Sequence, residues 1–498
     1  MKNKNNNLGK KSIFFFISNI LKQFIIFSST IIIANLLGTT DYGNYVYVVS
    51  FLSFFLIIPR FGLNNGLISF ISRNTISHIR KKELFTFSIF FSLLLSSISI
   101  ILMFIFKDFL YYTLMNSKAP YHMFLLMIPS IPTLIFIDLL SSNHKARGNT
   151  KVHTIMDNIF QPFLYCVTVL FLIFLTDVNN GLVLVFSFYI STIFTILSYL
   201  IITIKDDQFS NFNFFSKYNR ELLLCSFPLM LTSIIGIVLQ NVDKYMIGYY
   251  ISTSQIAIYR IALAFGTFSS VTLLSVTTIF SPIISRLYHD GNTSKIEIIY
   301  KQTTKGITIL NLFVFSIIFV LSKKIMGISG EEYVVGATAL ILVSLGQIFN
   351  SIVGAAGQIN IMTENRISNF YSVLFAFFTN ITLNFVLIGR YGINGVAFAT
   401  GFSLMMKNVL NFIFLYKKLR IQPYNKSFIL IFLTSLISIV LGIVLRNQIT
   451  NNILAMIIVS IFMALVYFTS ILFFVLSKEE KHYIYSFMSK NKKTMSNF

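Results

Sequence analysis

Four basic side chains lie inside long apolar segments of this 498-residue sequence, or at their ends: Lys22, Arg60, Arg260 and Lys407. An ionisable side chain in apolar surroundings is costly, so by default it faces a bundle interior or a water-filled cavity. Because all four residues are cations, a cavity that they line would favour an anionic ligand. They are the first candidates for chemistry in this chain.

Each of the four also has a simpler interpretation. Lys22 and Lys407 can extend their amines to a membrane surface, although this is strained for Lys22 near the middle of its segment. Arg60 can be an ordinary cytoplasmic-side charge, and Arg260 can anchor to lipid headgroups. The sequence leaves both interpretations open for every one of them.

Two carboxylates, Asp138 and Asp157, are candidates for ion coupling. They flank a basic loop that contains Lys145, Arg147 and Lys151. One interpretation is local ion pairing with that loop. The other is a carboxylate that binds a coupling ion, H+ or Na+, at membrane depth. The six histidines are scattered and predict no metal site, and Cys166 and Cys225 have no spacing typical of a disulfide framework or zinc site.

Amide side chains recur at helical spacing in several apolar segments. Such amides either hydrogen-bond neighbouring helices or suit the hydroxyl groups of a sugar, and the sequence does not decide between the two. Asn380 and Asn384 belong to one such stripe, and Gln240 and Asp243 to another. The candidates for sugar contacts are Asn19, Gln23, Gln240, Gln347 and Asn350.

The elements that must position these residues are long apolar helices. The chain is 55% hydrophobic and only 11% charged, with a mean hydropathy of +0.77, whereas soluble domains are about 25% charged. A membrane span needs about 20 apolar residues. We therefore predict an all-α polytopic membrane protein with about fourteen transmembrane helices, at 13–37, 43–64, 84–106, 120–140, 154–176, 182–204, 222–242, 255–281, 307–325, 334–357, 367–389, 392–416, 428–446 and 452–476.

Basic residues follow the topology of these spans. Most of the 39 Lys and Arg residues fall in every second connection, which predicts cytoplasmic loops and places both termini in the cytoplasm. Lys305 is expected in a cytoplasmic connection and Lys244 in an outer one. The net charge of +22 is thus explained by topology, and no nucleic-acid partner is expected.

Catalytic motifs are absent from the sequence. It has no phosphate-cradling glycine loop, no HExxH and no nucleophile elbow. The predicted connections are short, which leaves no room for a soluble catalytic domain. We therefore expect neither an enzyme nor a bound cofactor.

An internal repeat divides the first twelve predicted spans. Leu37-Gly38 with Tyr45 recurs as Ile247-Gly248 with Tyr259, and Asn180-Gly181 recurs as Asn394-Gly395. We predict an N-terminal six-helix lobe at 1–210, a C-terminal six-helix lobe at 211–420 around a central cavity, and two additional helices with a basic tail at 421–498.

Several short motifs resemble one family. The segment Ala34–Tyr45, which reads Ala-Asn-Leu-Leu-Gly-Thr-Thr-Asp-Tyr-Gly-Asn-Tyr, resembles the opening of bacterial polysaccharide-repeat flippases of the O-antigen and capsule (Wzx) type. These belong to the multidrug/oligosaccharidyl-lipid/polysaccharide exporter superfamily. The further matches are Arg60-Phe-Gly-Leu63, Ser226-Phe-Pro-Leu229, Asp243–Gly248, Ala257-Ile-Tyr259, Gly330–Tyr333 and Tyr391–Ala397.

The resemblance implies a task. It implies transfer of an undecaprenyl-diphosphate-linked oligosaccharide to the outer leaflet by alternating access, in the inner membrane of a bacterial cell, with polysaccharide polymerase or assembly proteins as partners. The lipid II flippase of this superfamily has cavity-facing cations in its first, second and eighth spans, and Lys22, Arg60 and Arg260 are similar in placement. Lys22 departs from that pattern because an amine binds phosphate as a point charge rather than as a bidentate fork.

Three alternatives remain at this stage. A multidrug extruder of the same fold would favour an acidic or aromatic cavity for organic cations, whereas the bias here is toward Lys and Arg. A membrane-embedded polysaccharide polymerase or ligase is disfavoured by the short outer loops. A scaffold for a glycan-assembly complex is the third.

Overall fold

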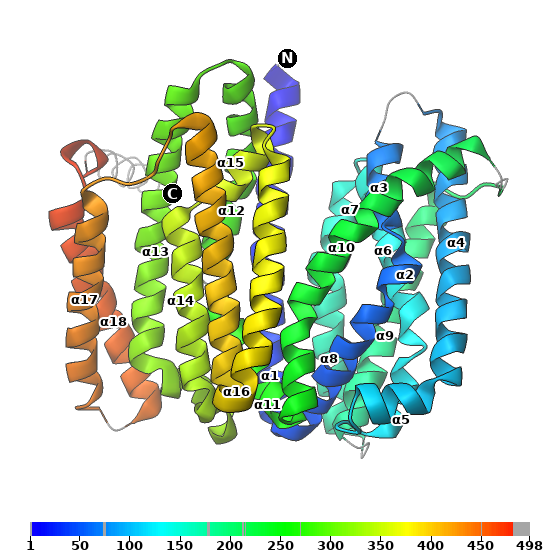
Figure 1. Cartoon of the computed structure of the whole chain (residues 1–498), viewed down its shortest axis with the longest axis horizontal. Helices are drawn as coiled ribbons and strands as arrows, with labels where there is room; N and C mark the ends of the chain where they lie inside the picture. Colours follow the sequence, from blue (N-terminus) through cyan, green and yellow to red (C-terminus); the bar gives the residue numbers. More distant parts are fainter. Residues whose placement is uncertain are drawn as a thin grey trace, which may run out of the picture. The chain divides into compact units, whose positions relative to one another are not determined.

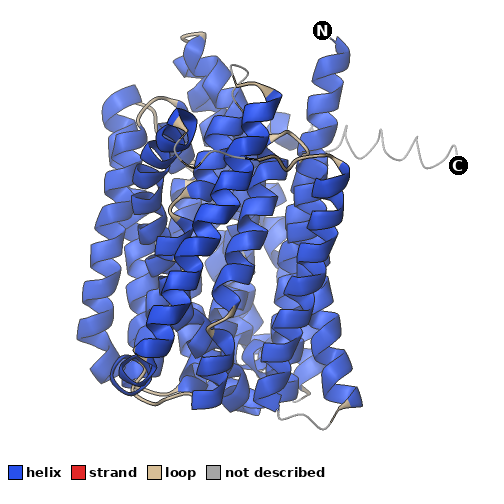
Figure 2. Ribbon diagram, turned by 90° about the vertical axis from the view of Figure 1, so that its right-hand side faces the viewer, coloured by secondary structure: helices blue, strands red, loops and turns tan. Residues whose placement is uncertain are grey.

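The chain folds into helices joined by short connections. The computed structural model describes residues 2–72, 76–176, 180–211, 214, 216–268, 270–449 and 451–481, and all regular structure in these ranges is helical (Figure 2). This is what a hydrocarbon environment requires, because a helix satisfies every backbone hydrogen bond within its own segment.

The helices divide between two compact units, which are described separately. The first unit comprises 1–265, 328–336 and 377–400, and the second comprises 266–327, 337–376 and 401–498. The six-helix lobes that the repeat predicts stay a prediction. The first unit contains α1 (Lys2–Phe55), α2 (Ile57–Arg60), α3 (Leu63–Ile71), α4 (His78–Ile105), η1 (Phe109–Leu114), α5 (Tyr121–Met127), α6 (Ser130–Ala146), α7 (Thr150–Ile155), η2 (Met156–Phe160), α8 (Gln161–Leu175), α9 (Asn180–Lys205), α10 (Lys217–Tyr250), nearly all of α11 (Thr253–Gly266), η3 (Glu331–Gly336) and the middle of α16 (Arg366–Leu419).

The second unit is built around a long helix. It contains α12 (Ser270–His289), α13 (Thr293–Gly327), α14 (Ala337–Val353), α15 (Ala356–Met362), the two ends of α16, α17 (Ser427–Arg446), α18 (Asn452–Ser470) and η4 (Ile471–Val475). One core cluster joins α13 to the C-terminal helices through Leu312, Tyr467 and Ile471. A second uses Leu321 and Met463. α17 and α18 are therefore packed on α13.

Eleven helices of the described residues are long and apolar enough to cross a membrane. Glycine turns account for part of the difference from the fourteen predicted segments. The predicted spans 13–37 and 43–64 both begin within α1, which is broken at Gly38 (φ 72°, ψ 179°), a conformation that only glycine adopts readily. Figure 1 shows the blue helix descending from the N-terminus and the chain then rising through α2 and α3. Likewise, 367–389 and 392–416 both lie in α16, which turns at Gly392.

One predicted span is divided in two. The segment 255–281 forms α11 and the beginning of α12, because the helix stops at Gly266 and resumes at Ser270. Other helices are longer than predicted. α10 continues to Tyr250, so Lys244 lies inside a helix and not in an outer connection, and α13 begins at Thr293, so Lys305 is helical too. The charged residues ended the predicted spans, but the helices continue because protein groups solvate those charges.

Close backbone contact joins α3 to α10 in the first unit. Gly62 has φ +67°, and a Cβ there would overlap the carbonyl oxygen of Ser226. A Cβ at Gly66 would overlap the Ser226 side chain. Two of the motifs that suggested the family, Arg60-Phe-Gly-Leu63 and Ser226-Phe-Pro-Leu229, are therefore in direct contact.

Candidate functional site

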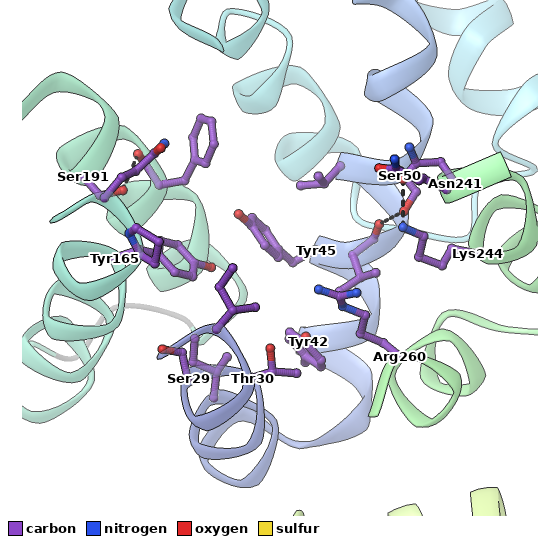
Figure 3. Close-up of a pocket in the computed structure, with 18 residues that line it drawn as sticks. Ser29, Thr30, Tyr42, Tyr45, Ser50, Tyr165, Ser191, Asn241, Lys244 and Arg260 are labelled. Carbon is purple, nitrogen blue, oxygen red and sulfur yellow. Dashed lines mark hydrogen bonds between the residues drawn. The ribbon is translucent and has the colours of Figure 1, made fainter. Parts of the chain in front are cut away.

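A cavity of about 450 Å³ lies within the first unit. Its walls come from both limbs of α1, from α8 and α9, and from α10 and α11. The turn at Gly38 brings Thr30 on one limb and Tyr45 on the other to the same space. Figure 3 shows Tyr165 and Ser191 on one side of this cavity and Lys244 and Arg260 on the other.

The mostly apolar lining of the cavity carries polar groups but no acidic side chain. Hydroxyl and amide groups come from Ser29, Thr30, Ser50, Ser191, Gln161, Gln240 and Asn241. The Tyr45 and Tyr165 rings are stacked, with centroids 6.5 Å apart and planes at 20°. The buried Tyr165 hydroxyl has no hydrogen-bond partner among the described residues. Such a surface offers hydroxyl, amide and aromatic contacts together.

Both charged residues in the cavity wall are basic. Lys244 Nζ donates to Asn241 Oδ1 at 2.8 Å, which fixes the amine at the wall. Arg260 makes no hydrogen bond or ion pair with any described residue. None of the 18 lining residues in Figure 3 is Asp or Glu. The positive charge in this cavity is therefore not compensated from its own wall, which favours an anion.

The acidic neighbour of Lys244 is engaged elsewhere. Asp243 is buried and accepts hydrogen bonds from Tyr259 (2.8 Å), Thr400 (2.6 Å) and Asn384 (2.6 Å). The Asn384 amide also donates to Asn380 Oδ1, and the buried Asn384 Oδ1 has no hydrogen-bond partner in the described residues. This Asp243 cluster presents carboxylate, hydroxyl and amide oxygens, which are the donors that hard cations prefer.

A second polar group, the carboxylate cluster, lies in the same unit. It consists of Lys22, Arg60, Asp138 and Asp157 with their partners. Arg60 Nη2 and Asp138 Oδ2 are 2.7 Å apart. Asp157 accepts hydrogen bonds from Ser141 (2.5 Å) and Tyr199 (2.6 Å), with His153 Nδ1 at 3.0 Å. The charge of Asp157 also acts on Lys22. In this cluster, Arg60 is ion-paired with a carboxylate.

The two carboxylates thus have partners other than the loop that they flank. Asp138 pairs with Arg60 on α2, and Asp157 with His153 and two hydroxyl groups, rather than with Lys145, Arg147 or Lys151. Local ion pairing with the loop is therefore not what these carboxylates do.

The other predicted site residues are divided between the units. Arg260 and Gln240 line the cavity. Asn19 accepts a hydrogen bond from Asn158 at 3.4 Å beside the carboxylate cluster, and Gln23 is exposed on α1. The second unit contains Lys407, Gln347 and Asn350. Asn350 donates to Gln347 at 3.3 Å, a contact within one helix. Their roles in binding stay predictions.

Three lining residues, Lys244, Tyr42 and Tyr165, are not among the site residues that the sequence predicts. Lys244 follows Gln240 by one helical turn and so continues the polar stripe of α10. That spacing was the available signal. No local sequence signal identifies Tyr165, because its place in the cavity wall depends on α8 packing beside α1.

No group of three or more His, Cys, Asp or Glu residues in the described ranges could hold a metal ion.

Comparisons with known proteins agree on one family and fold. The family model described as polysaccharide biosynthesis protein matches residues 8–288, and the MatE model matches residues 228–386. The uncharacterized membrane protein MJ1068 of Methanocaldococcus jannaschii is 24% identical, over 85% of this chain and 87% of its own length. The Probable low-salt glycan biosynthesis flippase Agl15 of Haloferax volcanii is 25% identical, over 43% of this chain and 44% of its own.

Solved structures share the fold. The lipid II flippase MurJ in an inward closed conformation superposes with a TM-score of 0.76 at 18% identity, covering 93% of this chain and 99% of that chain. An inward-facing MATE family multidrug resistance transporter of the MOP superfamily gives a TM-score of 0.63 at 14% identity, covering 82% and 98%. The polysaccharide family model spans more than half of the sequence. This multi-pass membrane protein therefore belongs to the polysaccharide biosynthesis protein family, and it shares its fold with MurJ and the MATE transporters.

Proposed function

We propose that this protein moves a lipid-linked oligosaccharide from the cytoplasmic to the outer leaflet of the cell membrane. The observation that carries the proposal is the cavity between the helices of the first unit, whose charged lining residues, Lys244 and Arg260, are both cations. The glycan flippase of Haloferax volcanii, similar over 43% of the chain, supports the substrate class. The lipid is undecaprenyl diphosphate, as the sequence resemblance implies.

The cavity chemistry suits such a head group. A diphosphate leaves water only where cations and hydrogen-bond donors replace its hydration. Sugar hydroxyls exchange their water for hydroxyl and amide partners, which Thr30, Gln161 and Gln240 supply. The polyprenyl tail has no need of this cavity and stays in the bilayer.

Transport would proceed by alternating access, with the predicted lobes opening to one face of the membrane at a time. We also propose that the chain crosses the membrane fourteen times with both termini in the cytoplasm, because the basic residues are concentrated in alternate connections. It places the protein in surface polysaccharide synthesis, such as O-antigen or capsule, together with polymerase or assembly proteins.

Coupling to H+ or Na+ belongs to the same proposal. Asp138 is the weaker of the two sequence candidates, because Arg60 already neutralises it at 2.7 Å. Asp157 lies 3.0 Å from His153 Nδ1 and accepts hydrogen bonds from Ser141 and Tyr199. Asp243 has no basic partner within ion-pair distance among the described residues and lies beside the unpartnered Asn384 oxygen. A cation or proton there would neutralise a buried carboxylate.

The test is the leaflet distribution of the lipid-linked oligosaccharide. When the gene is deleted, the lipid-linked oligosaccharide should accumulate on the cytoplasmic face of the membrane. Its distribution is measured by the accessibility of the glycan to an impermeant label in oriented vesicles. The wild-type gene should restore the distribution and Arg260→Gln should not, while Arg390→Gln, at an exposed position, serves as the matched control. An unchanged distribution on deletion, or efflux of an organic cation such as ethidium as the sole activity, would contradict the proposal.

A further inference from the structure

The connection between α13 and α14 folds onto the turn of α1. Residues 328–336 join two helices of the second unit along the chain, yet they belong to the first unit. Gly330, with φ +124°, turns this connection into η3. The Asn35 amide donates to the Ile328 carbonyl at 3.3 Å, which ties the beginning of the connection to α1.

This connection caps both ends of the break in α1. A helix leaves its last four carbonyls and its first four N–H groups without partners in its own backbone. The Ala34 carbonyl, in the last turn before Gly38, accepts a hydrogen bond from the Tyr333 hydroxyl at 3.2 Å. Beyond the break, the Thr39 N–H and hydroxyl both donate to Glu332 Oε2, at 3.4 and 2.7 Å. The helix dipole also favours a carboxylate at the beginning of this second limb.

Glycine contacts bring the second limb of α1 against α10 and α11. A Cβ at Gly43 would lie 2.1 Å from the Thr253 carbonyl oxygen, and a Cβ at Gly248 would overlap the Tyr47 ring. Small residues allow backbones to approach this closely. Because a glycine has no side chain to interlock with its neighbour, these surfaces can separate without repacking a core.

The cavity wall lies close to the residues that η3 holds. Thr30 is one helical turn before Ala34, and Tyr42 is three residues after Thr39; both line the cavity, and Figure 3 labels them. A change in the backbone angle at Gly38 therefore moves this wall of the cavity.

The polar contacts of η3 are suited to release. The Glu332 side chain is exposed, and so is the hydrogen bond of Asn35, so water can replace the protein partners when these contacts break. Tyr333, by contrast, is only 1% exposed and anchors the segment. The two limbs of α1 are joined by the single non-helical residue Gly38, and hinges are commonly a few residues that absorb a large change in φ and ψ.

We propose that η3 is a latch that holds the cavity closed at the Gly38 end, and that its contacts with Thr39 and Ala34 separate each time the cavity opens there. The latch rests on the proposed function, because alternating access requires this end to open in one state and to close in another. Since the connection is joined by peptide bonds to α13 and α14, a movement of those helices pulls on the turn of α1. Glu332 and Tyr333 are positioning residues for α1 and need not touch the transported lipid.

The first experiment measures access to the cavity without any substrate. Gln240, which is exposed and lines the cavity, is replaced by Cys in a variant that also carries Cys166→Ser and Cys225→Ser. The full-length protein in oriented vesicles receives an impermeant maleimide on one face at a time, and the labelling rate is measured by mass spectrometry. Glu332→Ala and Tyr333→Phe should each raise this rate roughly threefold to tenfold from the face opposite the N-terminus only, since each removes a hydrogen bond that stabilises the closed state.

Nearby positions supply the controls. Glu331→Ala removes a like charge from the neighbouring exposed residue, and Tyr391→Phe removes the hydroxyl of an exposed tyrosine, so both should leave the labelling rate within about twofold. Glu332→Gln keeps an acceptor oxygen for Thr39 and should restore most of the wild-type rate. Unchanged labelling in Glu332→Ala and Tyr333→Phe, or an equal rise from both faces, would overturn the latch.

The second experiment locks the latch. In the background without native cysteines, Thr39→Cys/Glu332→Cys is bridged with ethanediyl bis-methanethiosulfonate, a short linker that reducing agents remove. Transport of the lipid-linked oligosaccharide should fall by roughly tenfold or more in the bridged protein and return on reduction. Arg80→Cys/Glu83→Cys, one helical turn apart on α4, is bridged as the control and should transport at its unbridged rate. Undiminished transport by the bridged Thr39/Glu332 pair would overturn the latch.

Failure of the latch can be told apart from failure of the proposed function. If Glu332→Ala opens the cavity to the label but the wild type does not change the leaflet distribution of the glycan lipid, the latch stands and the flippase proposal fails. If the wild type moves the lipid and the bridged protein moves it at the same rate, the flippase proposal stands and the latch fails.

Discussion

Lys305 donates to both carboxylate oxygens of Glu480, at 2.9 and 2.7 Å. The lysine lies on α13 and its side chain is only 9% exposed, while Glu480 follows η4 at the end of the described chain. Lys305 also reaches the carbonyl of Val475 at 3.3 Å. This ion pair fastens the C-terminal helices of the second unit to α13, at a residue that the sequence suggested was a loop charge.

Breaking this pair should loosen the C-terminal segment. Glu480→Gln leaves a nearly buried ammonium group without its counter-charge, so we expect a loss of about 1–2 kcal/mol in the free energy of unfolding. Hydrogen exchange at 471–481 should rise, with the neighbouring Glu479→Gln as control. Unchanged exchange in Glu480→Gln would show that the apolar contacts of Tyr467 and Ile471 hold the segment alone.

The same pair predicts a pH dependence. Burial acts to raise the pKa of Glu480, but hydrogen bonds from Lys305 and Ser477 outweigh burial and bring this pKa below its ordinary value. A carboxyl whose pKa is lowered by folding stabilises the folded state above its ordinary pKa, and this stabilisation is lost as the pH falls through the lowered value. The difference in unfolding temperature between wild type and Glu480→Gln should therefore be constant near pH 7 and shrink below about pH 4.3. A difference that persists well below that pH would contradict the ion-pair explanation.

Arg60 and Asp138 should be energetically coupled. Asp138→Asn leaves Arg60 unpaired, and Arg60→Gln leaves the carboxylate unpaired, so each should destabilise the protein. The double variant should be more stable than the sum of the single effects predicts, with a coupling energy of about 1–3 kcal/mol in thermal unfolding. Additive single effects would show that the 2.7 Å contact contributes nothing to stability.

Gly62→Ala should destabilise the first unit. The residue has φ +67°, and a Cβ would meet the α10 backbone at Ser226, which cannot retract as a side chain can. We expect a loss of about 1–3 kcal/mol in unfolding free energy, measured in detergent. Gly306→Ala is the control, because a Cβ there meets nothing within 4 Å, and alanine should stabilise that helix by up to about 1 kcal/mol.

Tyr259→Phe should weaken the Asp243 cluster. The fully buried tyrosine hydroxyl donates to the Asp243 carboxylate at 2.8 Å, and its removal leaves that oxygen with Thr400 alone. A loss of about 1–2 kcal/mol in unfolding free energy is expected. Tyr371→Phe, at an exposed position, should have little effect. Equal effects of the two variants would show that this hydrogen bond does not stabilise the cluster.

The helical membrane architecture was predictable from the sequence because hydropathy and loop charge are properties of consecutive residues. Helix ends were less predictable. Asp243-Lys244 looked like the end of a span, yet α10 continues to Tyr250 because Tyr259, Thr400 and Asn241 solvate those charges. These partners come from other turns and helices, which periodicity does not reveal.

The sequence predicted that basic and amide side chains line the candidate site, but it identified only some of these residues. The sequence identified Arg260 and Gln240, which line the cavity, and Arg60, which is ion-paired with Asp138 instead. No local pattern distinguishes a free arginine from one that is paired with a residue on another helix. The sequence predicted a role for Asp138, but its ion-pair partner, Arg60, lies on α2 and not in the neighbouring loop.

The turn at Gly38 has a consequence for how the protein is made. It places the Thr30 and Tyr45 faces of the cavity on one helical hairpin, which leaves the ribosome before the other walls of the cavity. At about 5–20 residues per second, Asp138 follows Arg60 within about 4–16 s, whereas Lys244 follows Tyr45 only after about 10–40 s. The arginine can therefore acquire its counter-ion early during membrane insertion, and the half-built cavity remains without its cations until translation has passed the middle of the chain.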